Sequence, residues 1–125
     1  MVVGLGIDLV ELDRVEASLE RWGERLLEKL MDPAEAERLP AEPAGRVRAV
    51  AFAIAGKEAA SKALGTGWSR GVRWRDVVVD PGPPASASMK GRALEVARAL
   101  GSGGHGELSL EIRGNLALGE FRLLS

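Results

Sequence analysis

Near the middle of the chain, charged side chains interrupt a run of small apolar residues at a spacing that suits the binding of one ligand. These charged residues are Lys57, Glu58 and Lys62. Glu58 and Lys62 are four residues apart, so on a helix they lie one turn apart on the same face, with the acid before the base. Such a pair usually decorates a solvated helix face. Alanines border both charges, however, and small side chains would let a bulky molecule approach the backbone.

A further carboxylate stands at the end of an apolar segment at the N-terminus. Residues 1–10 are almost wholly aliphatic and predict a strand. Alternation along that strand puts large aliphatic residues on one face and Gly4, Gly6 and Asp8 on the other. An unpaired buried carboxylate costs several kcal/mol. Asp8 should therefore be metal-bound, salt-bridged, protonated or solvated at the strand's end, and the residues alone leave these alternatives open.

Length and composition indicate one domain that covers residues 1–125. The 125 residues are 46% hydrophobic, which suits a folded protein with a moderate core. The net charge of −1 disfavours nucleic acid as a partner. The absence of cysteine excludes thiolate chemistry and is compatible with a reducing compartment. No targeting segment or run of about 18 apolar residues is present, so we expect a cytoplasmic protein with no membrane partner.

Helical periodicity predicts a long helix at the centre of the fold. Asp13 is expected to cap an amphipathic helix that Gly23 bends or breaks, and Asp32-Pro33 is expected to begin a short helix that reaches Leu39. The long helix should run over about 44–64, and its continuously apolar middle indicates burial on most sides. Gly65 is expected to end it as a C-cap.

Strand patterns fill the remainder of the chain and indicate an antiparallel sheet. A strand is predicted at 72–79, a turn at 80–84, a weak strand at 85–89 and a helix at 90–100. Alternating residues over 108–124, with Gly114-Asn115 between them, predict a hairpin. The expected fold class is therefore α+β, with an antiparallel sheet and a long buried helix.

Other residues give weaker signals for chemistry. His105 follows a glycine connector, where a solvated loop histidine is more usual than a general base. Ser61 and Ser109 have no convincing histidine partner for Ser-His-Asp catalysis. The tryptophans suit core or interface packing better than a base-stacking platform.

Two motifs resemble a known family. The first is Gly6-Ile7-Asp8-Leu9-Val10-Glu11 followed by Arg14, and the second runs from Lys57-Glu58-Ala59 to Gly65-Thr66-Gly67. They are similar to the motifs of holo-[acyl carrier protein] synthase, the small bacterial 4'-phosphopantetheinyl transferase. The second motif matches the family pattern K-E-A-x-x-K-A-x-G-T-G at every fixed position, and weaker similarity extends through the whole chain.

The resemblance implies transfer of 4'-phosphopantetheine from coenzyme A to a serine of an apo acyl carrier protein in fatty acid biosynthesis. It also implies Mg²⁺, or Mn²⁺, held by Asp8 and Glu58, because a hard cation neutralises the charge that develops on a splitting diphosphate. Lys62 would contact phosphate, and Glu58 would remove the serine proton directly or through a metal-bound water. Gly65, Thr66 and Gly67 would let coenzyme A lie close to the backbone. Asp8, Glu58 and Lys62 are therefore the catalytic candidates.

The resemblance also implies partners. In the family a basic patch on the first helix receives the acidic carrier protein, and Arg14, Arg21 and Arg25 occupy successive turns here, joined by Lys29 and diluted by glutamates. A mixed-charge solvated helix explains the same residues equally well. The family's small members are homotrimers with the active site between subunits, which implies self-association.

The chain departs from the family pattern at two positions expected near the active site. Ala53 stands where the family usually has an arginine, and Ile112 stands where the terminal hairpin usually has a histidine. These departures keep a second hypothesis open: a degenerate, non-catalytic trimer that binds coenzyme A or the carrier protein. A third, a generic phosphate-binding module, explains the helix end and leaves Asp8 unused.

Overall fold

The structure is a computed structural model that describes all residues, 1–125. Its elements in chain order are β1 (Val2–Glu11), α1 (Leu12–Trp22), α2 (Glu24–Leu30), α3 (Pro33–Glu37), α4 (Pro43–Leu64), the 3-10 turn η1 (Trp74–Asp76), β2 (Val77–Asp80), β3 (Ser86–Met89), α5 (Gly91–Ala99), β4 (Gly106–Arg113) and β5 (Leu116–Leu124). One sheet has three antiparallel strands in the order β1-β5-β4, and a second pairs β2 with β3, also antiparallel. The fold is α+β, as expected.

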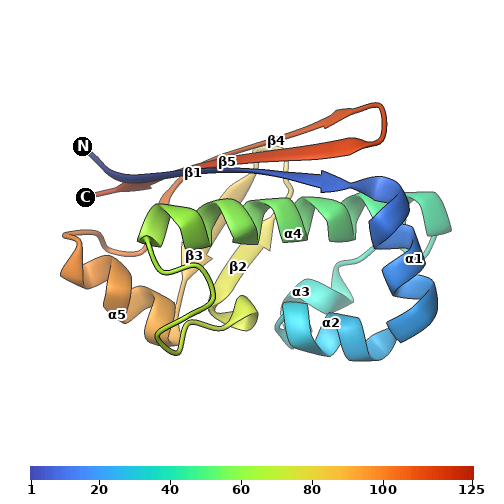
Figure 1. Cartoon of the computed structure of the whole chain (residues 1–125), viewed down its shortest axis with the longest axis horizontal. Helices are drawn as coiled ribbons and strands as arrows, with labels where there is room; N and C mark the ends of the chain where they lie inside the picture. Colours follow the sequence, from blue (N-terminus) through green and yellow to red (C-terminus); the bar gives the residue numbers. More distant parts are fainter.

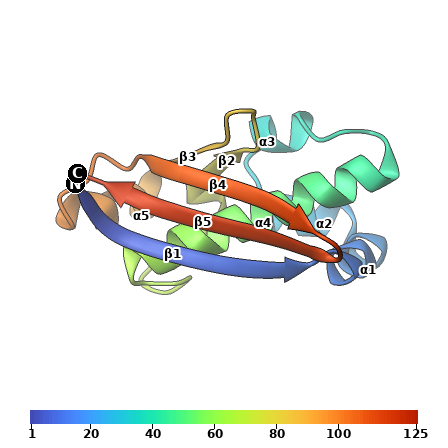
Figure 2. The ribbon, with the colours of Figure 1, turned by 90° about the horizontal axis from the view of Figure 1, so that it is seen from above.

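The three-stranded sheet has helices on one side only. The helix α4 runs beneath it along nearly its whole length, and the other helices lie on that same side (Figure 1). Seen from above, no helix crosses the opposite face of the sheet (Figure 2). The two termini lie together at one end of the sheet, where β1 begins and β5 finishes.

Close contact between β1 and α4 depends on glycine. A Cβ atom at Gly6 would lie 1.8 Å from the backbone oxygen of Ala59, far inside contact distance. On β5, a Cβ atom at Gly119 would lie 2.7 Å from the backbone oxygen of Ala55. Glycine and alanine therefore let the sheet rest almost directly on the helix backbone, and this fixes where the strand's polar residue meets the helix.

The core forms two clusters of buried side chains along α4. One lies around the C-terminal half of the helix and includes Phe121, Leu123 and Val77. The other lies around the N-terminal half and includes Val50 and residues of α1 and α2. Burial on both sides of a helix explains the apolar middle of its sequence. No helix of the protein meets the length and hydropathy that a bilayer span requires.

Several local predictions are confirmed. Gly23, with a φ of 51°, separates α1 from α2. Asp32 caps α3 in a capping box, since its Oδ1 accepts from the Glu35 N–H at 2.8 Å, although α3 ends two residues before Leu39. Gly65 caps α4 with a φ of 79°. The hairpin β4-β5 turns at Gly114-Asn115.

Two local predictions are wrong because distant residues intervene. Asp13 is not an N-cap: α1 begins at Leu12, and Asn115 of the hairpin turn accepts from the backbone N–H of both Leu12 and Asp13. The predicted strand 72–79 begins only at Val77. Before it, Asp76 accepts hydrogen bonds from Arg73 and closes the turn η1 instead.

Candidate functional site

Asp8 of β1 and Lys62 of α4 form an ion pair. The distance from Asp8 Oδ1 to Lys62 Nζ is 2.8 Å, and Lys62 also donates to the backbone oxygen of Ile7 at 3.1 Å. Close packing of Gly6 on the helix brings these side chains together. Of the alternatives that the sequence left open for Asp8, this structure contains the ion pair. Half of the Lys62 side chain remains exposed, so its charge stays accessible to an anion.

Glu58 joins this pair in an open groove of about 570 Å³ between the end of β1 and the exposed side of α4. The side chains that line it are those of Asp8, Leu9, Val10, Glu11, Arg14, Ile54, Glu58, Lys62 and Leu116. Glu58 and Lys62 share one face of the helix, as their spacing predicts. The groove thus presents three carboxylates and two cationic side chains to a ligand.

Partial burial raises the pKa of the Glu58 carboxyl above its ordinary value, and the negative charge of Asp8 raises it further. The Trp68 indole N–H and the Lys62 ammonium act in the opposite direction. The Trp68 indole N–H has no hydrogen-bond partner in this structure. A carboxylate with a raised pKa is better matched to accepting a proton near neutral pH.

The donor set of the groove fits a hard divalent cation. No group of three or more histidine, aspartate or glutamate side chains gathers anywhere in the chain to hold a metal by protein ligands alone. Mg²⁺, however, commonly uses only one or two carboxylates and completes its six oxygen ligands with water and substrate phosphates. Three carboxylates line the groove. Glu11 pairs with Arg14 at 3.4 Å, and Asp8 and Glu58 could serve as the metal ligands.

The turn after α4 leaves its backbone accessible. Gly65 and Gly67 have φ values of 79° and 57°, which favour glycine. A Cβ atom added at either position would meet nothing within 4 Å. The N–H groups of these glycines bond to the helix end, to Lys62 O at 3.0 Å and Ser61 O at 3.2 Å. The glycines therefore set the turn and leave open space beside it for a ligand.

The structure separates the three arginines that the sequence grouped together. Arg14 lines the groove and pairs with Glu11 at 3.4 Å. Arg21 lies over the ring of Trp22, 5.0 Å from its centroid. Arg25 belongs to α2 because Gly23 breaks the helix, so the patch does not follow successive turns of one helix. Arg14 also borders a second, adjoining groove of about 290 Å³ together with Lys29 of α2.

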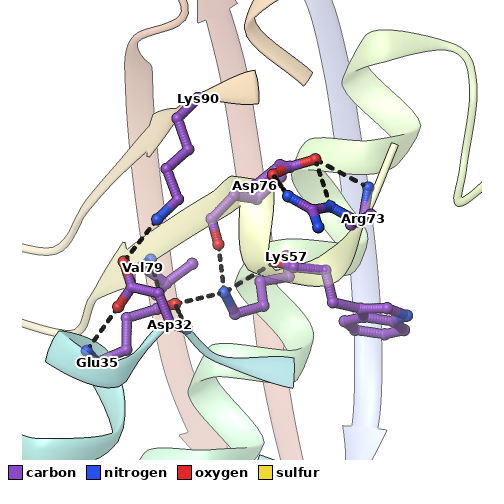
Figure 3. Close-up of polar contacts among 9 residues, drawn as sticks. Asp32, Glu35, Lys57, Arg73, Asp76, Val79 and Lys90 are labelled. Carbon is purple, nitrogen blue, oxygen red and sulfur yellow. Dashed lines mark hydrogen bonds and ion pairs between the residues drawn. The ribbon is translucent and has the colours of Figure 1, made fainter. Parts of the chain in front are cut away.

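Lys57, the first charged residue of the central motif, does not line the groove and is fully buried. Figure 3 shows its polar contacts. Its ammonium pairs with Glu35 of α3 at 2.9 Å and donates to the backbone oxygens of Trp74 and Val77. Burial lowers the pKa of Lys57, and Glu35 opposes that shift. Residues four before and three and seven after it are also buried, so helical periodicity could have predicted this orientation.

The residues that depart from the family pattern do not line the groove of Asp8, Glu58 and Lys62. Ala53 borders a separate cavity of about 330 Å³, beside Glu35 and Asp80. Ile112 packs against the core cluster around the N-terminal half of α4. Within one chain, neither position adjoins this groove, and their place near the active site stays a prediction. His105 is exposed and lies outside the groove as well.

Comparison with known proteins identifies the class. A sequence model described as the 4'-phosphopantetheinyl transferase superfamily matches residues 4–108. The chain therefore belongs to the 4'-phosphopantetheinyl transferase superfamily. Within it, the chain is 44% identical to the holo-[acyl-carrier-protein] synthase of Maridesulfovibrio salexigens, over 81% of this chain and 82% of that relative.

Solved structures share the fold. The holo-[acyl-carrier-protein] synthase of Neisseria meningitidis superposes with a TM-score of 0.82 at 24% identity, over 100% of both chains. A synthase from Bacillus anthracis, in complex with coenzyme A (3',5'-ADP), gives a TM-score of 0.71 at 26% identity, over 98% of this chain and 96% of that one. The predicted family is confirmed, and the similarity extends to nearly the full length.

Proposed function

We propose that this protein is a holo-[acyl carrier protein] synthase that transfers 4'-phosphopantetheine from coenzyme A to a serine of apo acyl carrier protein. The observation that carries the proposal is the convergence of Asp8, Glu58 and Lys62 on one groove, within motifs that match those of the family. The relative from Maridesulfovibrio salexigens carries the name of this activity. We propose the cytoplasm as its compartment.

Glu58 has the properties of a base for this reaction. In the proposed step it accepts the proton of the acceptor serine hydroxyl, and the serine oxygen forms a bond to the β-phosphorus of coenzyme A. The bond from that phosphorus to the bridging oxygen breaks, and adenosine 3',5'-bisphosphate leaves with the electron pair. The raised pKa of Glu58 favours proton acceptance in this position.

Lys62 and Asp8 prepare the groove for a diphosphate. Lys62 can move from Asp8 to a phosphate oxygen, because its side chain is half exposed and ion pairs in contact with water are worth only about 0–1 kcal/mol. The carboxylates of Asp8 and Glu58 would then hold Mg²⁺ or Mn²⁺. When bound, that ion supplies neutralisation of the negative charge on the diphosphate oxygens. The turn of Gly65, Thr66 and Gly67 would receive coenzyme A at the end of α4, since the space beside both glycines is open.

For the carrier protein we propose a docking surface that begins at Arg14. This residue borders the groove and is largely exposed, so it can meet an acidic partner beside the reacting groups. Arg21 and Arg25 are proposed to contribute from the end of α1 and from α2. Charge of opposite sign mainly raises the rate of encounter and fixes the orientation of the partner.

Self-association into a homotrimer is part of the proposal. The uncovered face of the sheet exposes Leu5, Ile7 and Leu9 of β1, each by 55–57%. Three large aliphatic side chains in a row on an uncovered sheet face are unusual for a surface that remains in water. A neighbouring subunit would cover them and would enclose the open groove, which one short chain leaves largely in contact with solvent.

The deciding experiment measures the carrier protein itself. Apo acyl carrier protein is incubated with the protein, coenzyme A and Mg²⁺, and then weighed by mass spectrometry. We expect the carrier to gain the mass of one phosphopantetheine, and we expect Glu58→Gln to abolish the gain. The control is an authentic synthase that modifies the carrier fully under the same conditions. If the protein then binds coenzyme A but the carrier gains no mass, the non-catalytic alternative is favoured. The next step would then be to introduce the residues usual in the family, arginine at Ala53 and histidine at Ile112.

A further inference from the structure

Arg70 is the only residue other than glycine with a positive φ, which is 58°. Nine further positions of the chain have a positive φ, and glycine occupies every one of them. A larger residue in this conformation costs free energy, because its Cβ atom crowds the backbone. Residues held in such conformations cluster at ligand sites, so the arginine at this position calls for a functional explanation.

Arg70 lies in a turn that is fastened to the end of α4. The Val72 N–H donates to the backbone oxygen of Ser69 at 3.2 Å, so Arg70 and Gly71 are the central residues of a four-residue turn. Both have a positive φ, as in a type I′ turn, where asparagine, aspartate or glycine usually takes the first central position. Ser69 donates its N–H at 3.3 Å and its hydroxyl at 2.6 Å to the backbone oxygen of Thr66.

The backbone of Arg70 is anchored, and its side chain is free. Arg92 of α5 donates from Nε to the backbone oxygen of Arg70 at 2.9 Å and also pairs with Glu95. The Arg70 side chain is exposed and makes no hydrogen bond or ion pair within the chain. The contacts that hold this turn therefore involve only the backbone of Arg70. They do not explain why the residue carries a guanidinium.

A phosphate group is the ligand that suits a free guanidinium, because arginine binds phosphate through paired, charge-assisted hydrogen bonds. Coenzyme A carries a diphosphate and a separate phosphate on the 3' position of its ribose. In the candidate groove, both cations, Arg14 and Lys62, pair with carboxylates, and Lys62 is the one assigned to the diphosphate. The 3'-phosphate thus has no cation of its own there. Thr66, in the turn assigned to coenzyme A, accepts the hydrogen bonds that hold the Arg70 turn.

We propose that Arg70 binds the 3'-phosphate of coenzyme A and makes the protein prefer coenzyme A to dephospho-coenzyme A, which lacks this phosphate. The inference rests on the proposed function, because that function places coenzyme A at the end of α4. Glycine would fit the turn with less strain. It would supply no charge for the phosphate, so the strained backbone is the cost of having a cation at this position.

Arg70→Gly should have opposite effects on stability and on binding. Glycine relieves the strain at a positive φ, so Tm should rise by roughly 2–5 °C at a fixed protein concentration. The Kd for coenzyme A, measured by isothermal titration calorimetry with Mg²⁺ present, should rise by about tenfold or more, because hydrogen bonds to a charged group are lost. Dephospho-coenzyme A should bind the wild type and Arg70→Gly with the same Kd.

Arg75→Gly is the matched control. Arg75 is also exposed and unpaired, but its φ is not positive. Glycine at this position should lower Tm, because the unfolded chain gains freedom, and should leave the Kd for coenzyme A unchanged. The assignment would be overturned if Arg70→Gly weakened coenzyme A and dephospho-coenzyme A equally, or if both arginine variants changed the Kd equally. A fall in the Tm of Arg70→Gly would also overturn it, because the backbone would then not be strained.

The outcome is separable from that of the transfer assay. If coenzyme A binds through Arg70 but the carrier gains no mass, this inference is supported and the proposed activity is refuted. If the wild type transfers phosphopantetheine but binds coenzyme A and dephospho-coenzyme A equally, the proposed activity stands and the role of Arg70 is refuted. A wild-type protein that binds no coenzyme A would overturn both.

Discussion

The buried pair of Lys57 and Glu35 should dominate the stability of the region around the candidate site. Lys57→Met keeps the length of the side chain and removes its charge. Glu35 would remain buried, accepting from the N–H of Val79 at 2.9 Å and of Asp32 at 3.1 Å, with no cation beside it. Two backbone oxygens, of Trp74 and Val77, would also lose their donor.

The expected loss of unfolding free energy is large because both partners are enclosed. Removal of one member of a buried pair typically costs about 3–5 kcal/mol. For a chain of this size, that loss corresponds to a fall in Tm of roughly 10–20 °C. The pair of Asp8 and Lys62 has nearly the same separation, 2.8 Å against 2.9 Å, but the Lys62 side chain is half exposed. Lys62→Met should therefore cost no more than about 1 kcal/mol.

Urea unfolding followed by circular dichroism measures both variants, at one protein concentration because association would change the apparent stability. The double variant Glu35→Gln/Lys57→Met should recover part of the loss, since it removes the uncompensated charge. If Lys57→Met and Lys62→Met have the same free energy of unfolding, the reasoning is contradicted, because burial would then not determine how much an ion pair contributes to stability here.

Three further predictions concern the groove and the sheet. Asp8→Asn should raise the Mg²⁺ concentration needed for transfer, because an anionic oxygen ligand is lost; full transfer in EDTA by this variant would reject the metal site. Because the pKa of Glu58 is raised in the folded protein, the native state holds that proton more tightly than the unfolded chain. As pH rises above the ordinary pKa of 4.5, the unfolding free energy of the wild type should therefore fall relative to that of Glu58→Gln, as measured by urea titrations. A difference in unfolding free energy that stays constant with pH would contradict the raised pKa. Sedimentation should give a mass near three times 13.2 kDa. Ile7→Asp should dissociate the assembly, whereas Leu100→Asp, at an exposed position after α5, should not. A wild-type monomer would refute the trimer.

Local patterns were sufficient where neighbouring residues alone decide the structure. Gly23 breaks a helix, Asp32 caps one, and Gly114-Asn115 turns a hairpin, because each depends on backbone preferences within a few residues. Helical spacing likewise put Glu58 and Lys62 on one face. The family followed from the same local information, since its motifs are short and continuous.

Contacts between distant segments required the tertiary structure. Lys62 and Asp8 are 54 residues apart in sequence and form an ion pair. Their contact depends on Gly6, which lets β1 pack closely on α4. Asn115 caps α1 across 102 positions and displaces Asp13 from that role.

Inside the central motif, helical periodicity could have predicted which face of α4 carries Lys57, but it could not have identified the partners of Lys57. Lys57 and Glu58 are adjacent in sequence, and both are charged. Lys57 can be buried because its ammonium pairs with Glu35 and donates to the backbone oxygens of Trp74 and Val77. Glu58 lines the groove instead. The sequence by itself determined which residues carry charge and which turns the chain makes. The tertiary structure decided which charges are buried as pairs and which remain free to meet a ligand, because the cost of burying a charge depends on partners that folding brings from elsewhere in the chain.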